Sequence, residues 1–186
     1  MKIFISGGCK NGKSSHAQRL AKKMQRGRPL YYLATMTPKD AEDEARILAH
    51  QKEREGCGFE TVEVPSGLLG ALSKCDPRGV FLLDSVTALL ENGMFLPDGS
   101  VDTGAHIKLC NDLISAIMGL RTIVIVSDYI YSDGIVYFDL VEGYKKNLAY
   151  IDRRLAAVCD VVIESCFGGV VIHKSNAQFR RLHDAI

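Results

Sequence analysis

The stretch Gly7-Gly8-Cys9-Lys10-Asn11-Gly12-Lys13-Ser14 decides the fold of this chain, because it matches the phosphate-loop pattern G-x-x-x-x-G-K-[ST]. The apolar run Ile3–Ile5 before it predicts a strand, and the helical spacing of apolar residues in Lys13–Gln25 after it predicts a helix. Glycines let backbone N–H groups converge on phosphate oxygens, and the helix N-terminus adds partial positive charge. We expect this loop to bind a nucleoside triphosphate; a Gly-rich turn with no ligand is the alternative.

Short apolar runs alternate with longer helical patterns in the rest of the chain, which is typical of a sheet covered by helices on both faces. Val80–Leu83 and Ile123–Val126 are apolar at every position, which indicates parallel strands buried on both faces. The predicted strands are Lys2–Ser6, Leu30–Thr35, Phe59–Val64, Val80–Asp84, Thr122–Ser127, Val161–Glu164 and Val170–His173. The predicted helices are Lys13–Gln25, Ala41–Glu55, Val86–Asn92, His106–Met118 and Tyr144–Val158. The predicted fold is therefore α/β, with a mostly parallel sheet flanked by helices.

Length and composition are those of one globular domain, residues 1–186, with 47% hydrophobic residues, 24% charged residues and a formal net charge of +1. A general nucleic-acid binder would normally carry a basic excess. No apolar run approaches the roughly 20 residues of a membrane span, so we expect a cytoplasmic protein without one. The six cysteines form no CxxC pair, which argues against a zinc cluster.

Three residues have the chemistry of a nucleotide site. Lys13 should reach the β- and γ-phosphates, and the Ser14 hydroxyl should bind Mg²⁺. Asp84 ends an apolar strand, the position at which such enzymes place an acidic residue close to the metal. Asp84 has a competing role, because Asp is also a preferred N-cap for the helix that follows.

His50 lies on the predicted helix Ala41–Glu55, on the face opposite its apolar stripe. That stripe consists of Ala41, Ala45 and Leu48. Arg46 and Arg54 are one turn away from His50 in each direction. Two adjacent cations would favour the neutral imidazole, the form that can attack phosphorus, and would also attract a triphosphate. From the residues alone, a solvated histidine on a charged helix face remains the alternative.

Several segments, in order, resemble the bifunctional adenosylcobinamide kinase and adenosylcobinamide-phosphate guanylyltransferase family of cobalamin biosynthesis. The pairing of Ala34-Thr35 with Ala45-Arg46-Ile47-x-x-His50 is the most particular feature, since many families share the phosphate loop. The matching segments are residues 7–17, Tyr32–Thr35, Glu44–His50, Leu82–Thr87, Ile123–Ser127 and Ile151–Asp160.

The resemblance implies a P-loop NTPase fold of RecA-like type and a two-step enzyme that uses GTP, ATP or both. A kinase step phosphorylates the aminopropanol hydroxyl of adenosylcobinamide, and a guanylyl group then passes from GTP to that phosphate. The family carries this group on a histidine, which matches His50 here. Positions near the guanine nucleotide match Ala34, Thr35, Lys52 and Glu63, and Asp84 matches a position where the family usually has Glu. The resemblance also implies a corrinoid substrate and a homotrimer.

The chain departs from the family after the strand Ile123–Val126: relatives commonly show Asn-Glu-Val-Gly followed by Gly-Ile-Val-Pro there, whereas this chain has Asp128 and then the segment Tyr129–Tyr137. Bulky tyrosines here would reshape the corrinoid side of the site, and Lys10-Asn11 replaces the usual Arg-Ser in the loop. Two other functions therefore stay open: a kinase acting on a different hydroxyl acceptor, and a GTP-binding regulatory protein without catalysis.

Overall fold

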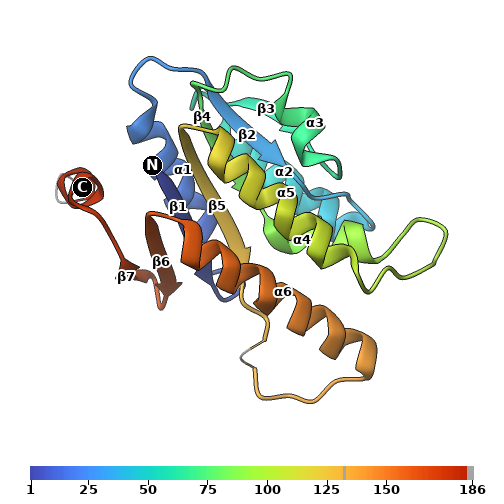
Figure 1. The fold of residues 1–186 in the computed structure, drawn as a ribbon. Helices are drawn as coiled ribbons and strands as arrows, with labels where there is room; N and C mark the ends of the chain where they lie inside the picture. The colour runs from blue at the N-terminus through green and yellow to red at the C-terminus, as the bar shows by residue number, and fades with distance from the viewer. Residues whose placement is uncertain (132, 184–186) are drawn as a thin grey trace.

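A computed structural model of the chain describes residues 1–131 and 133–183. Seven strands form one sheet in the order β3-β2-β4-β5-β1-β6-β7 (Figure 1). All neighbouring strands run parallel except β6 and β7, which are antiparallel. The strands are β1 Lys2–Gly7, β2 Leu30–Ala34, β3 Glu60–Glu63, β4 Val80–Asp84, β5 Thr122–Asp128, β6 Val161–Cys166 and β7 Gly169–Lys174. The predicted α/β class with a mostly parallel sheet is confirmed.

The five predicted helices are present, and two further short helices escaped prediction. The helices are α1 Lys13–Gln25, α2 Ala41–Arg54, α3 Leu68–Leu72, α4 Val86–Met94, α5 Ala105–Gly119, α6 Asp139–Val158 and α7 Ala177–His183. The α3 and α7 helices span fewer than three turns, so they show too little periodicity to be recognised. The α6 helix begins five residues before its predicted start, because Asp139 and Glu142 hid its first turn among polar residues.

The two faces of the sheet bury separate apolar clusters. On one face, α1 packs Leu20 and Ala21 against Ile3 and Ile5 of β1, and Phe179 of α7 joins this cluster. On the other face, α4, α5 and α6 cover the sheet side by side, as Figure 1 shows. Because each central strand is covered on both sides, its carboxyl end is the place where polar side chains can gather.

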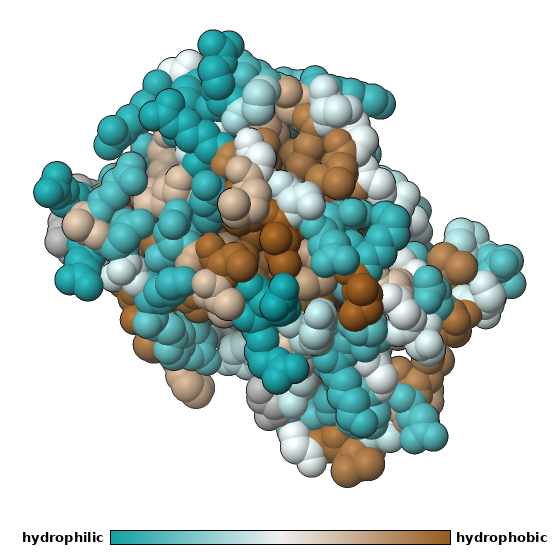
Figure 2. Space-filling model, viewed as in Figure 1, coloured by the Kyte–Doolittle hydropathy of each residue, from teal (hydrophilic) through white to brown (hydrophobic). Residues whose placement is uncertain are grey.

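The loop between β5 and α6 carries apolar side chains on the surface. Ile135, Val136 and Phe138 are 56%, 90% and 68% exposed. Figure 2 shows apolar side chains at the lower end of this face, where that loop lies. Among the described residues, none of the helices is both long and apolar enough to cross a membrane.

Candidate functional site

The phosphate loop connects β1 to α1 and is held in place by β6. A Cβ atom on Gly7 would overlap the backbone oxygen of Ser165, so only glycine fits there. Gly12 has φ +75°, a left-handed conformation that glycine adopts without strain. The Ser165 hydroxyl donates to Asn11 O at 2.8 Å, and Asn11 Nδ2 donates back to Ser165 O at 3.4 Å. These contacts fix the loop ahead of any ligand.

Lys13 is buried, with its side chain 5% exposed, although it carries a charge. Its ammonium donates to the Gly8 carbonyl oxygen at 2.5 Å and lies 2.6 Å from Asp128 Oδ1 at the end of β5. A buried cation is stable only when it is paired and hydrogen-bonded in this way. The arrangement keeps a charged group pointed into the loop, where phosphate oxygens would replace its present partners.

Asp84 ends β4 and lines the cavity. Its Oδ2 accepts a hydrogen bond from the Tyr32 hydroxyl at 3.0 Å. Burial, and then the charge of Asp84, raise the pKa of Tyr32 well above its usual value, so this phenol stays a donor. The Arg54 guanidinium lies 3.5 Å from the centre of the Tyr32 ring. The competing prediction for Asp84 fails, because Ser85 is the N-cap of α4 and accepts from Ala88 N.

Thr35 is fully buried directly after β2. Its hydroxyl donates to Ser85 O at 2.9 Å and accepts from Ser85 N at 2.6 Å. Asn92 of α4 donates to Thr35 O at 2.8 Å. Thr35 therefore joins the ends of β2 and β4 and holds the segment that carries Asp84 in position.

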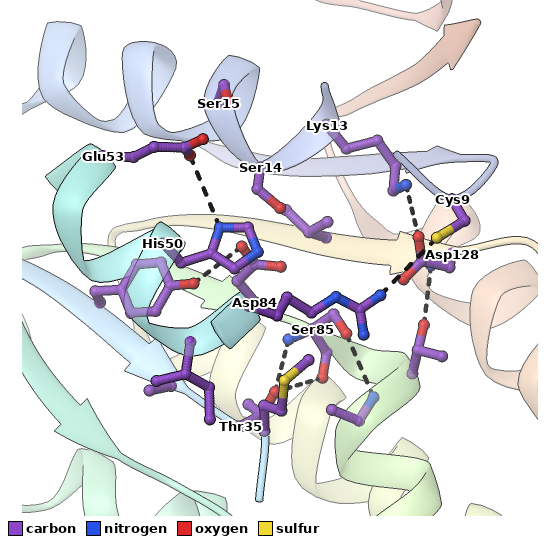
Figure 3. Close-up of a pocket in the computed structure, with 18 of the residues that line it drawn as sticks. Cys9, Lys13, Ser14, Ser15, Thr35, His50, Glu53, Asp84, Ser85 and Asp128 are labelled. Atoms are coloured by element: carbon purple, nitrogen blue, oxygen red, sulfur yellow. Dashed lines mark hydrogen bonds and ion pairs between the residues drawn. The ribbon is translucent and has the colours of Figure 1, made fainter. Parts of the chain in front are cut away.

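His50 reaches the cavity from α2, on the side facing the phosphate loop (Figure 3). Its Nδ1 atom is buried and has no hydrogen-bond partner; the nearest charged atom in an ion pair is Glu53 Oε2, at 3.8 Å. The expected arginine neighbours line the same cavity but have partners elsewhere. Arg54 stacks on Tyr32, whereas Arg46 contacts Cys9 Sγ and Asp43 Oδ1, each at 3.9 Å. Glu53, one turn along α2, is thus the charged residue closest to the His50 Nδ1 atom.

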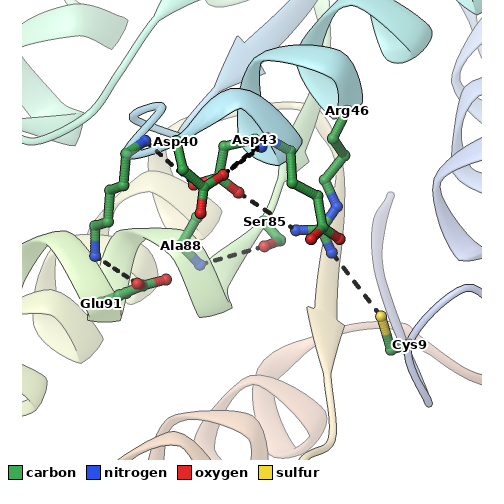
Figure 4. A network of polar contacts seen from close by, with 9 residues as sticks. Cys9, Asp40, Asp43, Arg46, Ser85, Ala88 and Glu91 are labelled. Carbon is green, nitrogen blue, oxygen red and sulfur yellow. Dashed lines mark hydrogen bonds and ion pairs between the residues drawn. The ribbon is translucent and has the colours of Figure 1, made fainter.

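A small polar network ties the beginning of α2 to the rest of the molecule (Figure 4). Asp40 caps the helix by accepting from Glu42 N and Asp43 N at 2.9 Å each. Lys39, just before the cap, forms an ion pair with Glu91 of α4. Most other side chains of α2 are exposed, and Arg54 is the buried residue of this helix.

The cavity between the phosphate loop, α2 and the ends of β2, β4 and β5 has a volume of about 510 Å³. The predicted residues that line it are Cys9, Lys10, Asn11, Gly12, Lys13, Ser14, Ala34, Thr35, His50, Glu63 and Asp84. Gly7, Gly8 and Lys52 are not among its lining residues. Lys52 is exposed on α2. One cavity thus brings together the loop lysine, the strand-end acid and the histidine.

The sequence analysis assigned no role to Asp128 or Tyr32, and it expected Arg54 beside His50 rather than on the Tyr32 ring. Asp128 directly follows an apolar strand, as Asp84 does, and this signal could have identified it. The Arg54–Tyr32 contact joins two elements whose packing no local pattern indicates. The resemblance placed the segment after β5 on the corrinoid side of the site, and Ile130 of that segment lines the cavity.

Metal binding would have to rely on few protein ligands. Among the residues that the structure describes, no three His, Cys, Asp or Glu side chains are grouped to hold a metal ion. Mg²⁺ in nucleotide enzymes takes one or two protein ligands and completes its octahedron with phosphate oxygens and water. Ser14 and Asp84 line the same cavity and fit that pattern.

Comparison with solved structures shows the fold. The flagellar accessory protein FlaH from Methanocaldococcus jannaschii is 15% identical, with a TM-score of 0.51 over 94% of this chain and 78% of that chain. A prototypical ATPase from the type III secretion system of pathogenic bacteria is also 15% identical, with a TM-score of 0.50 over 88% of this chain and 51% of that chain. The fold is thus that of RecA-like P-loop ATPases.

Comparison of the sequence with protein-family models shows the family of this chain. No curated protein matches the chain. The family model for cobinamide kinase / cobinamide phosphate guanyltransferase matches residues 3–172, which include the phosphate loop, His50, Asp84 and Asp128. The chain therefore belongs to this family of adenosylcobinamide kinases and guanylyltransferases of cobalamin biosynthesis.

Proposed function

We propose that one cavity serves both reactions of the family, with Lys13 holding the triphosphate and His50 carrying the guanylyl group. The observation that supports this most strongly is the position of His50, whose Nδ1 is buried without a hydrogen-bond partner and which lines the same cavity as Lys13 and Ser14. A histidine on a solvated helix face would have no reason to lie there.

The guanylyl transfer then takes two steps. Glu53 is on the Nδ1 side of the ring, which leaves Nε2 as the nitrogen that attacks the α-phosphorus of GTP. A P–N bond forms, the bond to the bridging oxygen breaks, and pyrophosphate leaves with the electron pair. A phosphate oxygen of the phosphorylated acceptor next attacks the same phosphorus, which breaks the P–N bond and restores His50.

In the kinase step, the chain supplies position and charge. Lys13 balances charge on the β- and γ-phosphates. Ser14 and Asp84 are the residues that would hold Mg²⁺, which supplies further neutralisation of the phosphates. The corrinoid acceptor would approach from the side of Ile130, which lines the cavity together with Asp128. A homotrimer remains a prediction from the family resemblance.

The test is to incubate the protein with α-labelled GTP and Mg²⁺, denature it, and map the labelled peptide. We expect acid-labile label on residue 50 of the wild type and none on His50→Ala. His106→Ala, which changes a half-buried histidine on α5 outside the cavity, is the matched control and should label like the wild type. Label at another residue, or GTP binding without label, would contradict the covalent role of His50 and restrict this cavity to the kinase step.

A further inference from the structure

A second cavity lies at the amino ends of the central strands, on the opposite edge of the sheet from the phosphate loop. Its lining includes Met1, which precedes β1, and Thr122, the first residue of β5. Because β1 rises about 3.3 Å per residue over its six residues, roughly 20 Å separates the two edges. The volume of this second cavity is about 820 Å³, a size typical of small-molecule sites. It is therefore large enough for a ligand and separate from the site described above.

Helix α7 forms one wall of the second cavity. Phe179 and Leu182 of α7 belong to the same apolar cluster as Leu20 and Met24 of α1. Lys23 of α1 donates a hydrogen bond to Leu182 O at 2.7 Å, which holds the two helices together. The family model ends at residue 172, before α7 begins. This wall is thus made by a part of the chain that the family model does not cover.

All the charged side chains that line the second cavity are positive. They come from the end of α1 and the turn after it, from the residue before β5, and from α7: Lys23, Arg26, Arg28, Arg121 and Arg181. Among the described residues, no Asp or Glu lines this cavity or forms an ion pair with any of these five side chains. The formal net charge of the whole chain is only +1, so this excess of positive charge is local.

These cations lie close enough together to repel one another. The Arg28 guanidinium is held by hydrogen bonds to Thr122 Oγ1 at 3.1 Å and to Gln25 O at 3.2 Å. Burial, and then the charges of Arg121 and Arg26, lower the pKa of Arg28 below its usual value. Arg26 and Arg121 are exposed and have no ion-pair partner among the described residues. An anion bound between these side chains would replace repulsion by attraction.

We propose that the second cavity binds a small molecule that carries a di- or triphosphate group. A guanidinium presents paired N–H donors that match two phosphate oxygens, and four of the five cations are arginines. A polyphosphate group brings several negative charges in a short chain, whereas a carboxylate side chain of a protein brings one. Nucleic acid fits less well, because it needs a basic surface of greater extent than one cavity.

Calorimetric titration with inorganic tripolyphosphate tests this proposal. We expect two sites per chain in the wild type, one in the phosphate loop and one in the second cavity. Arg121→Ala/Arg181→Ala should weaken the second site by about 10–100-fold, the usual effect of losing hydrogen bonds between charged groups, and leave the loop site unchanged. Both arginines are exposed, so the fold should be retained. Lys13→Ala should have the reverse effect, weakening only the loop site.

Arg153→Ala/Arg180→Ala is the matched control, because it removes the same charge from exposed positions outside the second cavity. This variant should keep both sites. A wild type with a single site that Arg121→Ala/Arg181→Ala leaves intact would overturn the proposal. Equal weakening by the two double variants would overturn it as well, because binding would then follow overall charge. The comparison of these two variants with the wild type decides even if Lys13→Ala does not fold.

Discussion

The phosphate loop and helix α2 supply the two halves of the site, and the molecule holds them very differently. The loop is held by β6 through Ser165. The buried Lys13 ammonium contacts the Gly8 carbonyl oxygen of the loop and the Asp128 carboxylate. The α2 helix instead turns its polar side to the cavity and leaves its apolar stripe in solvent, with Leu48 61% exposed. The difference teaches that phosphate binding is built into the sheet, whereas the histidine chemistry depends on a more loosely attached segment.

Lys13→Ala should have the largest effect on activity. Because both proposed reactions use the same triphosphate, kinase turnover and His50 labelling should each fall by about 10³-fold. Both assays would be run at several GTP concentrations, with Lys22→Ala, an exposed lysine on α1, as control. If His50 is still labelled in Lys13→Ala, guanylylation of His50 does not need the lysine of the phosphate loop.

The same substitution on the two helices should give very different changes in stability. Leu20 of α1 is fully buried, so Leu20→Ala should lower the free energy of unfolding by about 2–5 kcal/mol. Leu48→Ala should change it by less than about 0.5 kcal/mol, as is usual for exposed positions. Chemical denaturation of both variants gives the comparison. Equal losses would mean that the stripe of α2 is covered in solution, for example by another copy of the chain.

Arg54→Ala should lower stability less than Leu20→Ala does. It removes the side chain that α2 buries, which lies over the Tyr32 ring. Loss of the contact with Tyr32 should cost about 1–2 kcal/mol and lower Tm by about 3–6 °C. Labelling of His50 should fall more than GTP affinity, since the helix loses an anchor while the phosphate loop is intact. Arg153→Ala, an exposed arginine on α6, serves as control for the thermal melts. A fall in GTP affinity that matches the fall in labelling would contradict this separation.

The parts of the fold and site that follow local rules could be predicted from the sequence. The phosphate loop lies between a strand and a helix, and apolar runs such as Val80–Leu83 mark the buried strands. The bounds of α2 were also predicted to within one residue. The side of α2 that is buried was not predicted, because the analysis of amphipathic periodicity assumes that the apolar side faces inward. Here the helix turns its polar side to the cavity, so His50 is partly buried and Ala41, Ala45 and Leu48 are exposed.

The remaining features depend on the order of strands, which no local pattern contains. Asp128 meets Lys13 because β5 is a neighbour of β1, although more than a hundred residues separate them. Likewise, Ser165 supports the loop because β6 lies on the other side of β1. Such contacts come from the topology of the sheet, and a strand-end acid alone indicates only that a polar residue is near the site.

The central claim is that His50 carries the guanylyl group within the cavity formed with the phosphate loop. The most direct test is a chase: label the wild type with α-labelled GTP, remove free nucleotide, and add adenosylcobinamide phosphate. We predict that the label leaves the protein and appears in the guanylylated corrinoid at least as fast as steady-state turnover. Label that stays on His50, or that leaves more slowly than turnover, would contradict this account.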